Sequence, residues 1–216
     1  MATVPSFDPA AITVADELLT TTRAVRKRLD LEHDVDDALL REALAAARQA
    51  PSGGAEEPLR WLVVKDPGTR AAVGELYQAA YAELDRARPA PSGEAAGQLT
   101  KVRQSSAHLA QVMGKVPRII VVCSTAPAPQ AAVGAEAAKF YGSVYPAVWS
   151  FQLAARARGL GTCLTTIGLR RSGELAGVLG LPDDWTLCAL LPVARITGTT
   201  LGAAPRRNGE EVVRWI

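Results

Sequence analysis

The sequence has few of the residues that mark metal centres or nucleophilic catalysis. It holds three cysteines and two histidines among 216 residues. The odd cysteine count and the lack of a C-x-x-C pair predict buried thiols in a reducing compartment, although a redox role for Cys163 stays open. His33 and His108 are far apart in sequence, and neither has a cysteine or carboxylate at the spacing of a metal-binding motif, so we expect no metal site. No G-x-S-x-G elbow is present, which argues against a serine hydrolase.

The chain also lacks a strong charge of either sign and a long apolar run. Its 24 basic and 22 acidic residues give a net charge of +2, so neither nucleic acid nor a membrane surface is an expected partner. No apolar run approaches the roughly 18 residues that span a bilayer, and residues 1–9 lack the features of a signal peptide. We therefore expect a cytoplasmic protein. The basic residues gather in small clusters that suit a phosphate-bearing small molecule: Arg23 with Arg26–Arg28, Arg170–Arg171 and Arg206–Arg207.

Length and composition predict one folded domain over residues 1–216. Apolar residues make up 48% and charged residues 21%, which are ordinary globular values. Within this domain we expect a loose N-terminal arm over 1–13, a mobile excursion rich in Pro, Ala, Gly and Ser over 89–99, and a C-terminal extension over 197–216.

The order of helical and strand patterns predicts an α+β fold with a small sheet among many helices. Helices are predicted at 16–22, 37–50, 66–88, 100–114, 135–158 and 172–179, the fifth with a break near Pro146. Strands are predicted at 60–65, 118–124, 162–166 and 185–194. The dinucleotide motif G-x-G-x-x-G is missing, since Gly159-Leu160-Gly161 ends a helix and does not begin one.

Two segments near the N-terminus could bind a ligand. Arg23 and Arg26 are spaced by three residues around Ala24, so both guanidinium groups could hold one phosphate; the alternative is a solvated basic face. Pro51-Ser52-Gly53-Gly54 separates a helix from a strand, and its glycines would let a ligand approach backbone N–H groups; the alternative is an ordinary turn.

Two later segments offer similar choices. The loop Thr165-Thr166-Ile167-Gly168 follows a glycine stop and a short strand, and it could present backbone donors to a ring system or simply complete the core. Arg206-Arg207 is either a second phosphate clamp or part of a charged tail.

Taken in order, these segments resemble the nitroreductase family of FMN-dependent oxidoreductases, and most closely an actinobacterial type. The resemblance covers about residues 18–215. The matching stretches are TTRAVRKRLD at 21–30, QAPSGG at 49–54, residues 141–150, ARARGLGT at 155–162 and residues 206–215.

The resemblance implies a nitroreductase-like fold, with a mostly antiparallel central sheet surrounded by helices, and an intertwined homodimer with two FMN sites. It implies that Arg23, Arg26 and Arg207, with neighbouring Arg206, hold the phosphate and ribityl end. Ser52 and Gly53, after Pro51, would reach FMN from the partner subunit. Residues 165–168 would lie along the isoalloxazine. No protein residue need be catalytic, because flavin N5 carries the hydride from NAD(P)H to a nitro-aromatic, quinone or related small molecule.

The sequence departs from the family pattern beside the glycine turn. Ala55, Glu57 and Leu59 stand where the family usually has Asn, Gln and Trp, and Ala24 replaces a usual Ser. Each lost hydrogen bond costs about 0.5–1.5 kcal/mol, so FMN binding could be weakened or lost. Two alternatives therefore stay open: a flavin-dependent tailoring oxidase or dehydrogenase of a biosynthetic pathway, and a family-fold protein that has lost FMN. The choice between NADH and NADPH also stays open.

Overall fold

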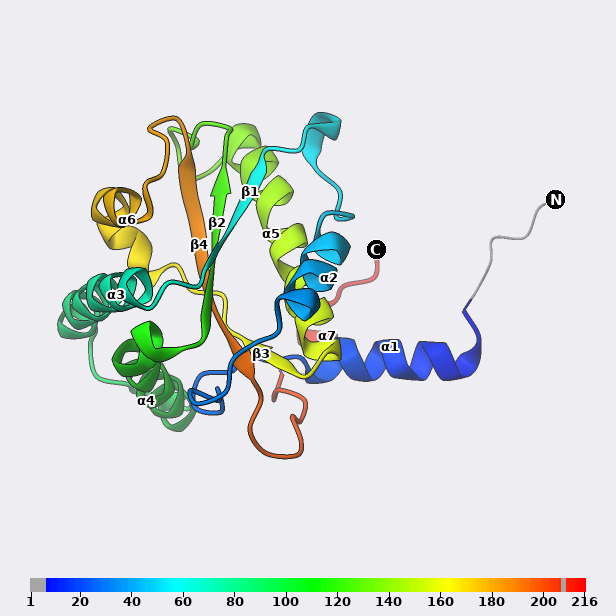
Figure 1. The fold of residues 1–216 in the computed structure, drawn as a ribbon. Coiled ribbons are helices and arrows are strands. Elements are labelled where there is room, and N and C mark those ends of the chain that lie inside the picture. The colour runs from blue at the N-terminus through cyan, green and yellow to red at the C-terminus, as the bar shows by residue number, and fades with distance from the viewer. Residues whose placement is uncertain (1–6, 207–208) are drawn as a thin grey trace.

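Four antiparallel strands form the centre of the protein (Figure 1). The structure is a computed structural model that describes residues 7–206 and 209–216. The strands are β1 (Leu59–Val64), β2 (Arg118–Ser124), β3 (Leu160–Thr162) and β4 (Thr186–Arg195), in the spatial order β1-β2-β4-β3. Every residue of β2 is buried, as expected for a central strand rich in β-branched side chains. The predicted α+β class with a small antiparallel sheet is confirmed.

Helices cover both faces of the sheet. On one face lie α3 (Pro67–Ala87), α4 (Ala96–Val112) and α6 (Ser172–Leu179), and on the other lie α2 (Asp37–Ala47) and α5 (Ala135–Ala157) (Figure 1). Val121 belongs to the first core and its neighbour Ile120 to the second, because successive strand side chains point to opposite faces.

Local capping signals set several helix ends. The Asp36 carboxylate accepts a hydrogen bond from Ala38 N–H at 2.8 Å at the start of α2, and Asp66 accepts one from Thr69 N–H at 2.7 Å at the start of α3. Gly159, with φ of 75°, follows the end of α5, where its left-handed conformation favours glycine. The predicted break at Pro146 is wrong, because α5 continues through this residue.

Several other boundaries differ from the prediction. Helix α1 (Pro9–Thr21) begins well before the predicted residue 16, because Asp8 caps it and Pro9 suits its first turn. Residues 9–13, which were expected in a loose arm, are therefore helical. Helix α2 ends at Ala47 and α4 begins at Ala96. The described residues also form the short 3₁₀ turns η1 (Gly53–Ala55), η2 (Met113–Lys115) and η3 (Ile167–Arg171), and the helix α7 (Gly209–Val212).

Helix α1 projects from the body of the protein (Figure 1). None of its residues is buried, although Ile12, Val14 and Leu19 are apolar. Within the described ranges, no helix is both long and apolar enough to cross a membrane.

Candidate functional site

The segment that carries Arg23 and Arg26 runs beside β3. Val25 N–H donates a hydrogen bond to Thr162 O at 2.8 Å, and the Val25 side chain is buried against Gly161. Arg26 is half-buried with its Nη1 3.4 Å from Ser105 Oγ on α4, and Arg23 donates to Gly202 O at 3.0 Å. Neither arginine belongs to an ion pair found among the described residues, so both positive charges are available to an anion.

The loop from Thr165 to Gly168 is anchored from several directions. The backbone N–H and C=O of Thr165 both pair with Leu190, at 2.9 and 3.0 Å. The strand predicted over 162–166 is wrong except at Thr162: β3 covers 160–162, where Leu160 and Gly161 pair with β4, and Thr165 forms only an isolated bridge. Gly168 is buried, and an added Cβ there would lie 2.7 Å from Leu190 Cδ1. Thr166 is exposed, and Ile167 begins η3.

Arg26 and this loop lie close together. Cys163, two residues before Thr165, is buried, and burial raises the pKa of its thiol while the neighbouring Arg26 guanidinium partly opposes the rise. Tyr77, from α3, places its OH 2.9 Å from Thr165 Oγ1. Sequence reasoning missed Tyr77 and Ser105, since each reads as an ordinary residue of a helix. A protonated Cys163 without a partner cysteine is a poor nucleophile, which leaves its redox role without support from the geometry.

The glycine turn rests on α5. Gly53 N–H donates to Ser143 Oγ at 3.0 Å, and a Cβ at Gly53 would lie 3.3 Å from Lys139 Cγ. Glycine therefore lets the turn approach the helix closely. The Ser52 hydroxyl donates to Glu56 O, which closes the turn.

The remaining residues of this segment differ in exposure, and Leu59 packs against the core on the α2–α5 face. Pro51 is exposed, and the Glu57 carboxylate pairs with Arg48 at 3.2 Å. Leu59 begins β1. The side chain of Ala55 lies outside the described part of the structure, as does Arg207, whereas Arg206 and Ala24 are exposed.

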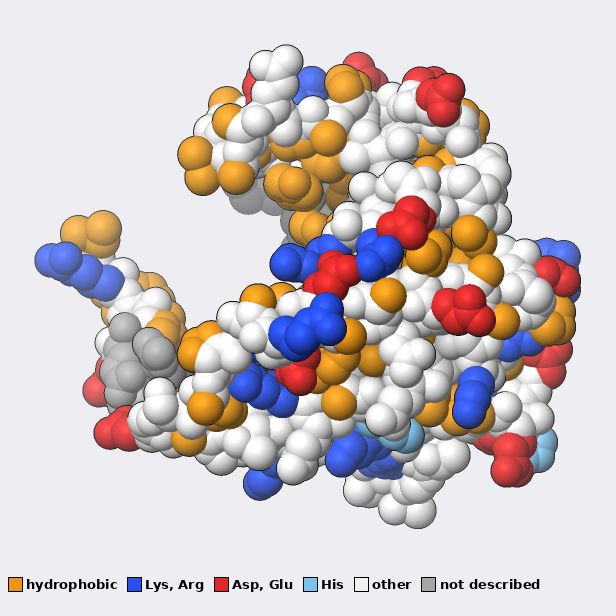
Figure 2. Space-filling view, turned by 90° about the vertical axis from the view of Figure 1, so that its left-hand side faces the viewer, with side chains coloured by type: hydrophobic (Ala, Val, Ile, Leu, Met, Phe, Trp, Pro, Cys, Tyr) orange, Lys and Arg blue, Asp and Glu red, His pale blue; other side chains and the backbone are white. Residues whose placement is uncertain are grey.

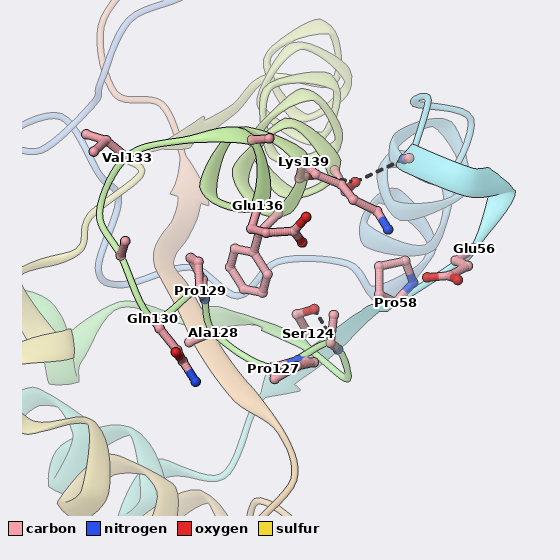
Figure 3. A pocket seen from close by; sticks show the side chains of 16 residues that line it. Glu56, Pro58, Ser124, Pro127, Ala128, Pro129, Gln130, Val133, Glu136 and Lys139 are labelled. Atoms are coloured by element: carbon pink, nitrogen blue, oxygen red, sulfur yellow. Dashed lines mark hydrogen bonds between the residues drawn. The ribbon is translucent and has the colours of Figure 1, made fainter.

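Two neighbouring cavities flank the first part of α5. The first, of about 590 Å³, lies beside Gly53; Glu136 and Lys139 of α5 border it, opposite Pro58 and Ser124 (Figure 3). The second, of about 800 Å³, is lined by exposed Thr166 and by aromatic residues. These are Phe140, Tyr141, Tyr145 and Trp185, of which Tyr141 and Tyr145 stack at 5.7 Å. Ala128 and Phe140 line both cavities.

One side of the molecular surface is deeply hollowed (Figure 2). Hydrophobic side chains gather along the upper rim of this hollow, and basic and acidic side chains are mixed along its floor. Such a surface offers both apolar and charged contacts to a ligand.

Strand register separates the glycine turn from Arg26. Leu59, which follows the turn, pairs with Ser124 of β2, and Ser124 pairs with Thr186 of β4. At the other end, Thr162 accepts the hydrogen bond from Val25 and pairs with Val193 of β4. Positions 186 and 193 of β4 are about 23 Å apart at about 3.3 Å per residue. The structure thus brings Arg26 together with the loop at 165–168 but leaves Ser52 and Gly53 of the same chain at the other end of the sheet.

The fold and these segments define the class of the protein. The sequence model of the nitroreductase family matches residues 19–195. The chain therefore belongs to the nitroreductase family, as its sequence resemblance predicted.

Solved structures share this fold across almost the whole chain. A structure of oxidized iodotyrosine deiodinase bound to FMN and 3-iodo-L-tyrosine is 22% identical, with a TM-score of 0.73 over 93% of this chain and 98% of that one. A BluB-like flavoprotein from Clostridium difficile 630 is 18% identical, with a TM-score of 0.69 over 94% and 98%. A mutant of the FMN and NADPH-dependent nitroreductase NfnB from Sphigopyxis sp. strain HMH is 20% identical, with a TM-score of 0.68 over 93% and 98%.

Proposed function

We propose that this protein is an FMN-dependent oxidoreductase that uses NAD(P)H to reduce a nitro-aromatic, quinone or related small-molecule acceptor. The observation that carries the proposal is the meeting of Arg26 with the loop at 165–168. A half-buried guanidinium without a carboxylate partner in the described chain lies beside Cys163, two residues before this uncharged loop. Family membership and the FMN named for two of the structural relatives support it.

The residues present fit a flavin mononucleotide. Arg23 and Arg26 match a phosphate, because the planar guanidinium presents paired N–H donors to its oxygens. The loop from Thr165 to Gly168 would orient the flat ring system. Bound FMN would supply the hydride chemistry, so the task of the chain is to bind and orient the cofactor and acceptor.

The same geometry supports a homodimer. A cofactor held by Arg26 cannot also be reached by Ser52 and Gly53 of the same chain if they lie at the far end of the sheet. A second copy would supply that turn. Helix α1, which has no buried residue, and the exposed side chains of Val213 and Trp215 offer apolar surface for such a partner.

The Arg48–Glu57 pair bears on whether FMN is retained. Glu57 replaces a neutral amide of the family pattern, and an unpaired anion there would oppose a reduced flavin. Because its carboxylate is bonded to Arg48, the charge is balanced locally. The pair therefore lessens the electrostatic objection that Glu57 raises to a reduced flavin.

Titration of the purified protein with FMN tests the proposal. We expect flavin fluorescence to be quenched on binding. Because Arg26 would make a half-buried charged contact with the FMN phosphate, Arg26→Gln should weaken binding about 10- to 100-fold. Arg86→Gln, an exposed change on α3, is the matched control and should bind FMN like the wild type.

Stopped-flow mixing with NADH and with NADPH then tests the direction of the chemistry. We expect at least one nucleotide to bleach the bound flavin. A protein that takes up no FMN would refute the proposal. A bound flavin that neither nucleotide bleaches would instead support the tailoring oxidase or dehydrogenase.

A further inference from the structure

The two cavities beside the first part of α5 differ in the charge of their walls. They adjoin each other, because Ala128 and Phe140 line both. The described residues that line the larger cavity include no Asp, Glu, Lys, Arg or His, and four of them are aromatic. The smaller cavity is lined by Glu56, Glu136 and Lys139. A ligand that reaches both cavities would therefore need an uncharged ring at one end and a charged group at the other.

Glu136 is the charged group that faces into the smaller cavity. It stands in the first turn of α5, and its carboxylate is directed into the cavity, whereas the Lys139 side chain extends toward Pro58 and Glu56 (Figure 3). Among the residues that the structure describes, no cation pairs with Glu136 and no carboxylate pairs with Lys139. Two carboxylates thus outnumber one ammonium in this cavity, and the charge of Glu136 can be met by a positive group of a ligand.

The aromatic rings of the larger cavity add a second attraction for a positive group. Tyr141 and Tyr145 stack with centroids 5.7 Å apart and ring planes 9° apart, and Phe140 meets Tyr141 edge-on at 5.2 Å. Tyr141 is 40% exposed, so a ligand can reach its ring. Aromatic faces attract cations and also stack with the flat rings of a ligand. The carboxylate of one cavity and the rings of the other therefore favour the same kind of molecule.

We propose that the acceptor reduced by this protein is an aromatic molecule that carries a positively charged amine, and that Glu136 determines this preference. The inference rests on the proposed function, whose acceptor it narrows. The ring of the acceptor would lie against Tyr141 and Tyr145, and its ammonium group would meet the Glu136 carboxylate. An anionic acceptor would instead meet a cavity in which carboxylates are in excess, so it should bind less well.

Three nitrobenzenes of similar size test the preference: para-nitrobenzylamine is cationic at neutral pH, para-nitrobenzyl alcohol is neutral and para-nitrobenzoate is anionic. Their dissociation constants from the FMN-loaded protein are measured by calorimetry without nucleotide, and kcat/KM is measured with the nucleotide that bleaches the flavin. Reduction of the nitro group to a nitroso group consumes one NAD(P)H and one proton and releases one water. Glu136→Gln removes only the charge. Glu75→Gln is the matched control, because Glu75 is an exposed residue of α3 that lines neither cavity.

We expect the wild type to bind the amine about 3- to 10-fold more tightly than the benzoate, with the alcohol between them, and kcat/KM to follow the same order. Glu136→Gln should remove this order, and added salt should weaken it, because salt screens exposed charges. Lys139→Gln should strengthen binding of the amine, since it removes a like charge. Tyr141→Leu should weaken binding of all three probes, and Glu75→Gln should keep the wild-type order.

Three results would overturn the inference while leaving the proposed function intact. The first is equal binding of the three probes by an FMN-loaded wild type, and the second is tighter binding of the benzoate. The third is a preference for the amine that survives Glu136→Gln. A wild type that takes up no FMN would instead refute the proposed function, and a ligand of these cavities would then be no electron acceptor.

Discussion

The contact between Gly74 of α3 and Gly114 of η2 should tolerate no side chain. A Cβ at Gly74 would lie 2.5 Å from both the Cα and the N of Gly114, and these are backbone atoms that cannot rotate away. Overpacking costs about 1–3 kcal/mol, and we place this site near the upper end, at about 3 kcal/mol. Alanine regains about 1 kcal/mol of helix propensity, so Gly74→Ala should lose about 2 kcal/mol of unfolding free energy. For a chain of this length the melting temperature should fall by about 4–8 °C.

Gly177→Ala in α6 is the matched control, because an added Cβ there meets no atom within 4 Å. It should gain up to about 1 kcal/mol from helix propensity alone. Urea denaturation followed by circular dichroism, at one fixed protein concentration, measures both variants. A Gly74→Ala protein as stable as the wild type would refute the reasoning, and so would a control that loses as much stability as the test variant.

Three further predictions concern the loop, the thiols and one charged pair. The methyl group of Gly168→Ala would clash with the Leu190 side chain and displace the loop, so both urea stability and FMN affinity should fall. Wild-type values for both would contradict this close packing. At pH 8 the three thiols should react with dithiobis-nitrobenzoic acid far more slowly in native protein than in urea. The reason is that burial raises the pKa of Cys123 to about 11, that of Cys188 to about 12, and also that of Cys163. A thiol that reacts fast in the native protein would argue against this burial. The hydrogen bond from Arg118 lowers the pKa of Asp34 below its ordinary value of 3.8. The ionised Asp34 carboxylate therefore stabilises the fold at pH values above 3.8, and this stabilisation is lost as the pH falls through the lowered pKa. Asp34→Asn should be less stable at pH 7 and lose less stability below pH 4, as measured by urea denaturation across pH; an unchanged acid slope would count against the pairing.

Features that depend on neighbours in sequence could be predicted well. β2 and α6 have the predicted bounds, and Gly159 ends α5 as expected, because β-branched runs, caps and glycine stops act within a few residues. The start of α1 was missed although Asp8 and Pro9 carry the local signal. The Arg23–Arg26 pair and the loop at 165–168 were identified as candidates, but their mutual position could not be, since it depends on how Val25 bonds to β3 and how α3 packs against η3.

The sequence by itself determined the family, the α+β class, and most helices and strands, and it named candidate segments for a cofactor site. Only the tertiary structure decided that Tyr77 meets Thr165 across 88 residues, that Gly74 meets Gly114, and that the glycine turn lies at the far end of the sheet from Arg26. The physical reason is the range of the interactions. Caps and periodicity are fixed by residues one or two turns away, whereas a buried phenol or a close backbone contact depends on how whole elements pack.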